Sequence, residues 1–333
     1  MVGVRVVAAP DKFRGTATAA AVAAAIGRAA AAAGWEYDEV PMADGGEGTL
    51  DALGGPNRLT VVTGPLGRPV EAAWRLDGSL AVIEMARASG LDLVGGSEGN
   101  DPVAASTIGV GQLIVAAIDN GARRVIVGLG GSATTDGGLA ALRALYPLGR
   151  LKGVEIIAAC DALVGFFEAA TQFATQKGAT PAQVELLRRR LERLAQVYLD
   201  EHGVDVVGLP GAGAAGGLGG GLAAASAVLV SGFELVADEV RLDERLEGAD
   251  LVITGEGFLD EQSFEGKVVG GVASLAGTLG VPAAAIAGQI YDGMGDRIEA
   301  VSLVDRFGDE RAMGDTLACI EEAAADVLAG HGA

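Results

Sequence analysis

The last third of the chain alternates short apolar runs with longer segments of helical character. The apolar runs at 249–257, 282–289 and 298–305 are typical of buried strands. The segments at 267–280 and 316–330 are typical of helices, and residues 290–297 are loosely helical. Parallel strands need a long crossover connection between them, and a helix is the usual one. This βαβαβα order therefore predicts a parallel sheet with helices on its faces.

The first 58 residues extend the same sheet. A strand-like run at 4–10 is followed by an alanine-rich helix at 16–34, with Thr16 or Thr18 as its cap, and by a second strand that starts near residue 37. The last third and this segment together supply five strands, which suit a flavodoxin-like doubly wound sheet.

The middle of the chain has a different character. Residues 59–86 are typical of strands joined by turns at Gly64-Pro65 and Asp77-Gly78, which makes neighbouring strands antiparallel. We therefore predict two domains in an α/β protein. The predicted domains are a discontinuous flavodoxin-like domain at 1–58 and 240–333, and a mixed α/β domain inserted at 59–239.

The charge of the chain argues against several classes of partner. Its 333 residues carry a net charge of −20, which repels nucleic acid and anionic membrane surfaces. We expect a small-molecule substrate instead. The two cysteines, Cys160 and Cys319, fit a reducing cytoplasm, and the early Asp11 and Lys12 do not fit a signal peptide. We expect a cytoplasmic protein, with monomer and homodimer both open.

Glycines and acids gather where the predicted strands end. Four apolar strands run into small or acidic residues, at 40–48, 126–138, 251–257 and 285–289. Ligands of open parallel sheets bind outside the carboxyl ends of the strands, and glycine there lets backbone N–H groups approach a phosphate closely. One such end alone is explained by a tight strand-to-helix turn. Four in one chain favour a site for phosphate and metal.

Charged side chains lie at or near the same strand ends. The acids are Asp44, Glu47, Asp136, Glu256 and Asp260. Carboxylates beside phosphates usually hold Mg²⁺, although each acid could instead cap a helix. The cations Lys12, Arg14 and Lys267 could clamp a phosphate or a carboxylate, or form surface salt bridges.

A second glycine-rich stretch, LPGAGAAGGLGGGL at 209–222, offers a competing interpretation. Its spacing Gly211-x-Gly213-x-x-Gly216 is that of the dinucleotide fingerprint, which indicates an NAD-dependent oxidoreductase. Pro210 interrupts the strand-to-turn junction, however, and the required βαβ unit would fall in the inserted region. A helix N-terminus packed by small residues explains the spacing equally well. The sequence has no Walker A motif, and it lacks the HRD and DFG motifs of protein kinases.

Ten short motifs occur in the order in which one known family has them. They are APDKFRGT, PMADGGEGT, VTGPLGRPV, VIEMARASGL, GLGGSATTDGG, QKGATP, LPGAGAAGGLGGGL, DLVITGEG, DEQSFEGK and AIAG. Together they resemble the bacterial type I glycerate kinases, the glycerate 2-kinase group, from Val6 to Gly288. The resemblance implies a flavodoxin-like domain with an inserted second domain. It also implies phosphoryl transfer from MgATP to a hydroxyl of D-glycerate, giving 2-phosphoglycerate, with ATP and Mg²⁺ as cofactors.

The chain also departs from the family pattern. Phe258 stands where the family has an arginine, and the segment after residue 149 is shorter than in the family. An arginine beside transferring phosphates stabilises the transition state, so its loss bears on activity. Three hypotheses stay open: a kinase for glycerate or a related acid, a divergent member that takes another small hydroxy acid or binds nucleotide without turnover, and an oxidoreductase.

The kinase hypothesis gives each candidate residue a role. The predicted catalytic residues are Asp136, Lys267 and Lys12, and the predicted metal ligands are Asp44 and Glu47. Asp136 would position or deprotonate the acceptor hydroxyl, while the lysines offset negative charge. The residues predicted to bind substrate or phosphate are Arg14, Arg68, Gly130, Gly131, Ser132, Thr134, Gly255 and Glu256.

Overall fold

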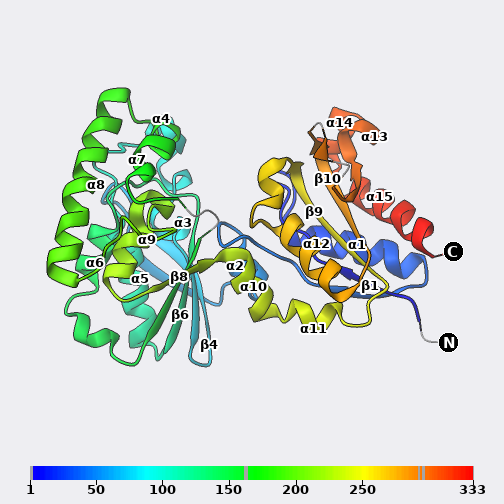
Figure 1. Ribbon diagram of the computed structural model, residues 1–333, viewed down its shortest axis with the longest axis horizontal. Coiled ribbons are helices and arrows are strands. Elements are labelled where there is room, and N and C mark those ends of the chain that lie inside the picture. Colours follow the sequence, from blue (N-terminus) through cyan, green and yellow to red (C-terminus); the bar gives the residue numbers. More distant parts are fainter. Residues whose placement is uncertain (1–2, 161–163, 292, 295–296, 333) are drawn as a thin grey trace. The chain divides into compact units, whose positions relative to one another are not determined.

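The computed structural model describes residues 3–160, 164–291, 293–294 and 297–332, which form two compact units (Figure 1). Unit 1 contains the chain up to Asp44, the short piece Asp51–Leu53 and everything from Phe233 on. Unit 2 contains Gly45–Leu50 and Gly54–Gly232. Both junctions differ from the predicted boundaries, because the chain first enters unit 2 at Gly45, before residue 59, and leaves it at Gly232, before residue 240.

Unit 1 is built on a five-stranded parallel sheet. Its strands are β1 (Arg5–Ala8), β2 (Glu36–Glu39), β9 (Leu251–Leu259), β10 (Ala283–Ile290) and β11 (Glu299–Ser302). They lie in the order β11-β10-β9-β1-β2, which is the flavodoxin order when strands are counted within the unit. The predicted fold class is confirmed, and the switch point of the sheet falls between β1 and β9.

Helices cover both faces of this sheet (Figure 1). They are α1 (Ala19–Ala32), α10 (Gly232–Val240), α11 (Leu242–Leu246), α12 (Val268–Leu279), α13 (Leu303–Phe307), α14 (Asp309–Gly314), α15 (Thr316–His331) and the 3₁₀ helix η4 (Glu261–Phe264). Helices α1 and α15 pack over Val6 and Ile286, and α10 to α12 pack over Val7 and Val252. Thr18 caps α1 by accepting a 3.2 Å hydrogen bond from the Ala21 amide, so the second predicted cap is confirmed.

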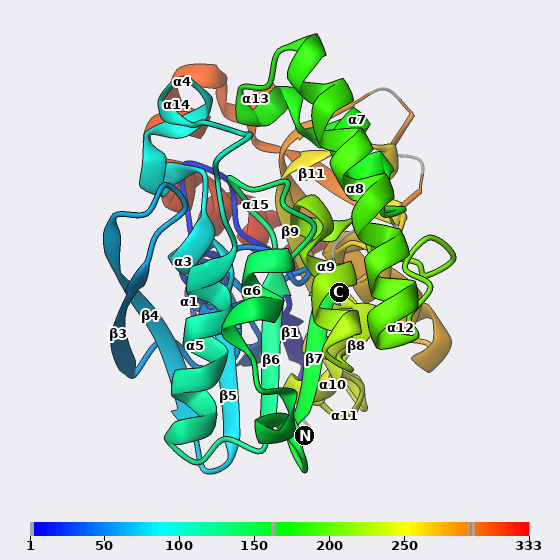
Figure 2. The same cartoon turned by 90° about the vertical axis from the view of Figure 1, so that its left-hand side faces the viewer.

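Unit 2 is built on a six-stranded mixed sheet, whose strands lie side by side in chain order (Figure 2). They are β3 (Arg58–Thr63), β4 (Pro69–Asp77), β5 (Leu80–Glu84), β6 (Arg124–Leu129), β7 (Glu155–Cys160) and β8 (Val228–Ser231). The first three strands pair antiparallel across the two predicted turns, and β5 to β8 pair parallel. The predicted mixed character of this unit is confirmed.

The helices of unit 2 bury large side chains against its sheet. They are α3 (Ala86–Ser89), α4 (Gly96–Gly99), α5 (Ile108–Asp119), α6 (Leu139–Ala144), α7 (Glu168–Phe173), α8 (Pro181–His202) and α9 (Ala214–Ala224), with 3₁₀ helices η1 (Asp92–Val94), η2 (Leu148–Leu151) and η3 (Thr175–Lys177). The short helix α2 (Thr49–Ala52) is divided between the units. Trp74, Phe166 and Tyr198 are fully buried in the core of unit 2. No helix in the described part of the chain is long and apolar enough to cross a membrane.

Candidate active site

The loop after β6 holds Asp136 in a fixed position in unit 2. One carboxylate oxygen of Asp136 accepts hydrogen bonds from the Thr107 amide at 3.0 Å and from the Thr107 hydroxyl at 2.9 Å. The other oxygen accepts from the Gly138 amide at 3.1 Å. Thr107 directly precedes α5 and Gly138 directly precedes α6, so both helix N-termini supply donors to this carboxylate.

The environment of Asp136 changes its proton affinity. Burial raises the pKa of this carboxyl above its ordinary value, and the hydrogen bonds from Thr107 and Gly138 oppose that rise because they favour the ionised form. A carboxylate with a raised pKa is a better proton acceptor than an exposed one. The arrangement therefore suits the base predicted from the sequence.

The glycines of the same loop lie against the segment that carries Glu47. A Cβ atom at Gly130 would lie 2.6 Å from the Gly46 Cα atom. At Gly131, whose φ is +63°, a Cβ atom would collide with the Glu47 carboxylate. The close approach of this neighbouring segment by itself requires small residues at both positions. The structure thus brings Glu47 beside the predicted phosphate loop within unit 2.

Three buried oxygens around this loop have no hydrogen-bond partner among the described residues. They are Thr134 Oγ1, Thr135 Oγ1 and Asn100 Oδ1. The two threonines are 0% and 1% exposed, and Ser132 in the same loop is 8% exposed. Buried polar atoms in folded proteins are nearly always paired, so unpaired ones concentrated in one place indicate a position where a ligand or water completes the bonding.

Lys177 is a site residue that the sequence reasoning did not select. It ends η3 and is buried, with Nζ donating a 2.6 Å hydrogen bond to the Thr134 carbonyl. Burial lowers the pKa of Lys177 to about 7, against the opposing charge of Asp136. Asn100 ties the two segments together by donating to the carbonyls of Ala133 and Lys177, at 3.0 and 2.9 Å. The available signal was the position of this lysine inside the QKGATP motif.

The glycine-rich stretch at 209–222 packs against the Asp136 loop. The Gly216 carbonyl accepts a 3.0 Å hydrogen bond from the Gly137 amide, and a Cβ atom at Gly216 would collide with the Thr134 carbonyl. A Cβ atom at Gly221 would lie 2.6 Å from the Gly138 Cα atom. Residues 203–213 are all described and contain no strand, so the strand that opens a dinucleotide fold is missing here. The small residues serve packing, as the alternative interpretation predicts.

Unit 1 gathers a second set of the predicted residues at the carboxyl ends of β1 and β9. Burial raises the pKa of Asp11 to about 6; the charge of Lys12 opposes the rise and that of Asp44 adds to it. Lys267, directly before α12, also acts on Asp11. These residues therefore lie close enough to interact at the switch point, where ligands of such sheets bind.

Glu256 belongs to the same set. Burial raises its pKa to about 7, a hydrogen bond with Ser263 opposes that rise, and the charges of Asp11 and Asp260 add to it. Glu256 Oε1 is buried and has no hydrogen-bond partner among the described residues. Asp260 caps η4 by accepting from the Ser263 amide at 3.1 Å. One predicted acid thus serves partly as a cap, while Glu256 is left with bonding capacity for a cation or a ligand.

Three other predicted residues stand apart from these contacts. Arg14 and Arg68 are exposed, and Arg68 lies in the turn between β3 and β4, where its carbonyl accepts a 2.7 Å hydrogen bond from the Gly64 amide. Gly255 lies inside β9, and a Cβ atom there would collide with the Ile286 carbonyl of β10. Its small size is explained by sheet packing, and binding by these three residues stays a prediction.

Phe258, where the sequence is expected to depart from the family pattern, is 51% exposed on β9. Its ring centroid lies 6.4 Å from that of Tyr291, which is 50% exposed. Phe258 is therefore part of an exposed aromatic pair.

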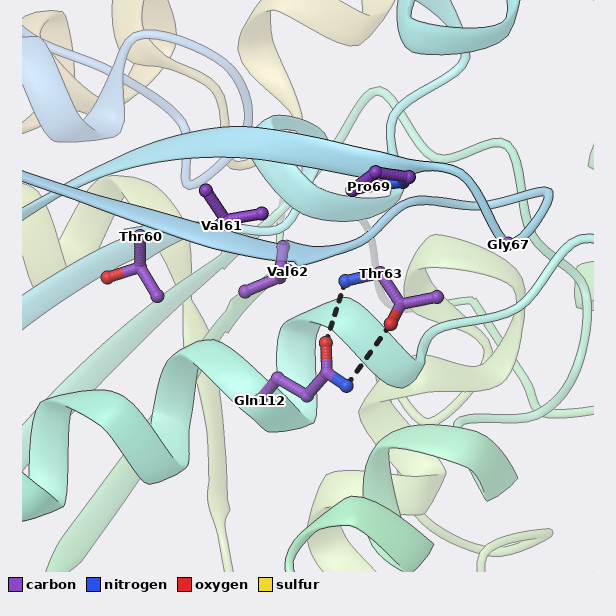
Figure 3. Close-up of a pocket in the computed structure, with 7 residues that line it drawn as sticks. All are labelled: Thr60, Val61, Val62, Thr63, Gly67, Pro69 and Gln112. Carbon is purple, nitrogen blue, oxygen red and sulfur yellow. Dashed lines mark hydrogen bonds between the residues drawn. The ribbon is translucent and has the colours of Figure 1, made fainter.

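A hollow of about 400 Å³ lies elsewhere in unit 2, against the β3–β4 hairpin and α5 (Figure 3). The Gln112 side chain closes its floor by accepting from the Thr63 amide at 2.7 Å and donating to the Thr63 hydroxyl at 3.2 Å. None of its lining residues is titratable: they are Thr60, Val61, Val62, Thr63, Gly67, Pro69 and Gln112. This hollow has no group that could act as an acid or a base, so it is not the candidate active site.

Comparisons with known proteins give the family of this chain. The sequence profile of the glycerate kinase family matches residues 6–146 and 148–330. The Glycerate kinase of Halalkalibacterium halodurans is 40% identical, with 97% of each chain covered, and the Glycerate 2-kinase of Escherichia coli K12 is 40% identical, with 87% of each covered. A solved structure of a Salmonella typhimurium LT2 protein assigned as glycerate kinase 2 superposes with a TM-score of 0.81 at 34% identity, covering 98% of each chain. By sequence and by fold, this chain belongs to the glycerate kinase family.

Proposed function

We propose that the protein phosphorylates D-glycerate with ATP, giving 2-phosphoglycerate and ADP, in the cytoplasm. Its family membership and the activities named for its relatives support this reaction. The observation that carries the proposal is the Asp136 carboxylate, which is aimed by Thr107 and whose pKa is raised by burial. A base of this kind is what a hydroxyl acceptor requires.

The proposed phosphoryl transfer forms one bond to phosphorus, breaks another and moves one proton. The acceptor hydroxyl oxygen forms a bond to the γ-phosphorus of ATP, and the bond from that phosphorus to the bridging β–γ oxygen breaks. ADP leaves with that electron pair. The hydroxyl proton passes to the Asp136 carboxylate. Positioning of the hydroxyl accounts for much of the rate enhancement, because the protein forms no covalent bond to the substrate in this phosphoryl transfer.

The remaining predicted residues bind and neutralise phosphates in this proposal. In unit 2, the amide and hydroxyl of Ser132 and the amide of Thr134 donate to phosphate oxygens. In unit 1, the ammonium groups of Lys12 and Lys267 offset phosphate charge. Their effect on Asp11 supports this role, because both positive charges lower the pKa of that carboxyl.

We propose Asp44 and Glu47, three residues apart in the chain, as the carboxylates that would hold the Mg²⁺ of MgATP. Among the described residues, no group of three or more His, Cys, Asp or Glu side chains is placed to hold a metal ion. That observation fits Mg²⁺, which binds nucleotide phosphates with only one or two protein carboxylates. The charge of Asp44 adds to the raised pKa of Asp11, so a cation there would relieve carboxylate repulsion. The ion would neutralise phosphate charge.

The test is ADP release from MgATP by the purified protein, with and without D-glycerate. Release that depends on D-glycerate, with 2-phosphoglycerate identified by phosphorus NMR, is the expected result. Glycerol serves as the control acceptor, because it offers hydroxyls without a carboxylate. Absence of turnover on D-glycerate, with MgATP still binding in calorimetry, would instead support the divergent member that acts on another acid or only binds nucleotide.

A further inference from the structure

Lys177 is a buried lysine that forms no salt bridge with any residue in the described part of the chain, although the charge of Asp136 acts on it. Its side chain is 6% exposed. Its Nζ atom donates one hydrogen bond within the described residues, to the Thr134 carbonyl. An ammonium group has three N–H donors, so two are left for another partner. Burial disfavours the charged ammonium group and Asp136 offsets this only in part, so an anion bound beside Lys177 would stabilise it further.

The surroundings of Lys177 supply further donors. The hydroxyls of Thr134 and Thr135 are buried and unpartnered, and each can donate one hydrogen bond. The segment that carries them is joined to Lys177 through the Thr134 carbonyl and through Asn100. An ammonium group, which only donates, and two hydroxyls that can each donate are together complementary to an anion. The unpartnered Asn100 Oδ1 differs, because it can only accept, and it suits a hydroxyl of the same ligand.

We infer that Lys177, with the hydroxyls of Thr134 and Thr135, binds the carboxylate of the acceptor acid in unit 2. The inference rests on the proposed function. One observation and one chemical argument favour the carboxylate over a nucleotide phosphate. Lys177 bonds to Thr134, two residues before Asp136, so the anion site and the base share one loop. A small hydroxy acid has its carboxylate and its reacting hydroxyl on neighbouring carbons, so it needs both functions that close together.

The electrostatics of Lys177 give this site a measurable property. Burial lowers the pKa of the free lysine to about 7. Asp136, on the loop after β6, is the charge that acts on it, while Glu98 of α4 and Glu168 of α7 are exposed. A bound carboxylate favours the charged ammonium and raises this pKa. Binding of the acid above pH 7 is therefore accompanied by uptake of a proton.

The experiment compares Lys177→Met, which removes the charge, with Lys177→Arg, which keeps it. Lys152→Met is the matched control, because Lys152 is exposed in the same unit. Calorimetry measures the affinity of the full-length protein for D-glycerate and for MgATP in separate titrations. Circular dichroism checks that each variant is folded. Lys177→Met is expected to weaken D-glycerate binding by roughly 30-fold or more, with MgATP binding unchanged. Lys177→Arg should retain part of the affinity, and Lys152→Met all of it.

A loss of MgATP affinity with D-glycerate binding intact would overturn the inference and assign Lys177 to the phosphates. Unchanged binding of both ligands would also overturn it. If Lys177→Met does not fold, the wild-type protein provides the test. D-glycerate is titrated at pH 8 in buffers of different ionisation enthalpy, and proton uptake on binding is the expected result. Binding without proton uptake would contradict the site.

The two proposals fail in different ways. Wild-type turnover of D-glycerate, with unchanged D-glycerate affinity in Lys177→Met, removes only the carboxylate site. Where the wild type does not turn over D-glycerate, the proposed acceptor fails and D-lactate and glycolate serve as carboxylate probes. Charge-dependent binding of either probe at Lys177 supports the site, and no binding of any of the three acids overturns it.

Discussion

Thr107 donates two hydrogen bonds to a single oxygen of Asp136, one from its amide at 3.0 Å and one from its hydroxyl at 2.9 Å. The same hydroxyl accepts a 3.1 Å hydrogen bond from the Ala141 amide in α6. The start of α5, the loop after β6 and the first turn of α6 are thereby held together at the proposed base. The Thr107 hydroxyl therefore contributes to both the orientation and the proton affinity of Asp136.

Replacing Thr107 by valine should shift the acid limb of the pH–rate profile to higher pH. The hydroxyl favours the ionised form of Asp136, so its loss raises the pKa of that carboxyl further, and the base is protonated over a wider range. We expect a shift of about one pH unit, from kcat measured between pH 5 and 9. Thr107→Ser keeps the hydroxyl and should behave as the wild type. Coincident profiles for the valine and wild-type proteins would show that Asp136 does not titrate in the rate.

Gly216→Ala should destabilise the protein by roughly 1–3 kcal/mol. Gly216 has a φ of +74°, and a Cβ atom there would collide with the Thr134 carbonyl. The matched control is Gly277→Ala in α12, where no atom lies within 4 Å of the new Cβ atom and φ is not positive. That control should gain roughly 0.5–1 kcal/mol, because alanine favours a helix interior. Urea unfolding measures both, and equal midpoints would contradict the packing role of the 209–222 stretch.

The stability of the free protein should depend on pH through Lys177. Its pKa is lowered from 10.5 to about 7 in the folded protein, so above pH 7 the unfolded chain binds more protons than the folded one. The free energy of unfolding therefore rises with pH across that interval. Lys177→Met lacks this dependence, so its stability relative to the wild type should be greatest below pH 7 and should decline towards about pH 10. Parallel stability curves for the two proteins would contradict a buried, titrating lysine.

Glu256→Gln should have the opposite pH signature. The pKa of Glu256 is raised from 4.5 to about 7, so between these values the folded protein binds more protons and loses stability as pH rises. The glutamine variant avoids the cost of ionising this buried group. It should be more stable than the wild type at pH 8 and indistinguishable near about pH 4, in a chelating buffer. Glu261→Gln, at an exposed position, is the control. A difference in stability between Glu256→Gln and the wild type that stays constant from about pH 4 to pH 8 would show that Glu256 does not cause the pH dependence.

The strand pattern of the sequence was sufficient to predict the sheet of unit 1, because alternating apolar runs and helices leave few other topologies. The sequence also placed Asp136 and Glu256 near strand ends, where parallel order brings side chains together. The sequence did not predict that the chain enters unit 2 at Gly45. The segment Gly45–Leu50 belongs to unit 2 because of contacts between residues distant in sequence, such as those of Gly46 with Gly130 and of the Gly48 amide with Glu84.

Lys177 was missed for a related reason. A lysine is normally exposed, and nothing in the pattern around it indicates that its side chain is buried against Thr134. The fingerprint spacing at Gly211 shows the reverse difficulty. Local spacing resembled a nucleotide loop, whereas the missing strand and the tight approach to Gly137 and Gly138 are properties of the folded chain alone.

The most direct test of the account is the turnover number of Asp136→Asn with MgATP and D-glycerate. Asparagine keeps the shape of the side chain but cannot accept the hydroxyl proton, so kcat should fall by roughly 10²–10⁴-fold while MgATP affinity is retained. Asp119→Asn, at the exposed end of α5, should keep wild-type turnover. An Asp136→Asn protein with wild-type kcat would contradict the central claim that this carboxylate is the base.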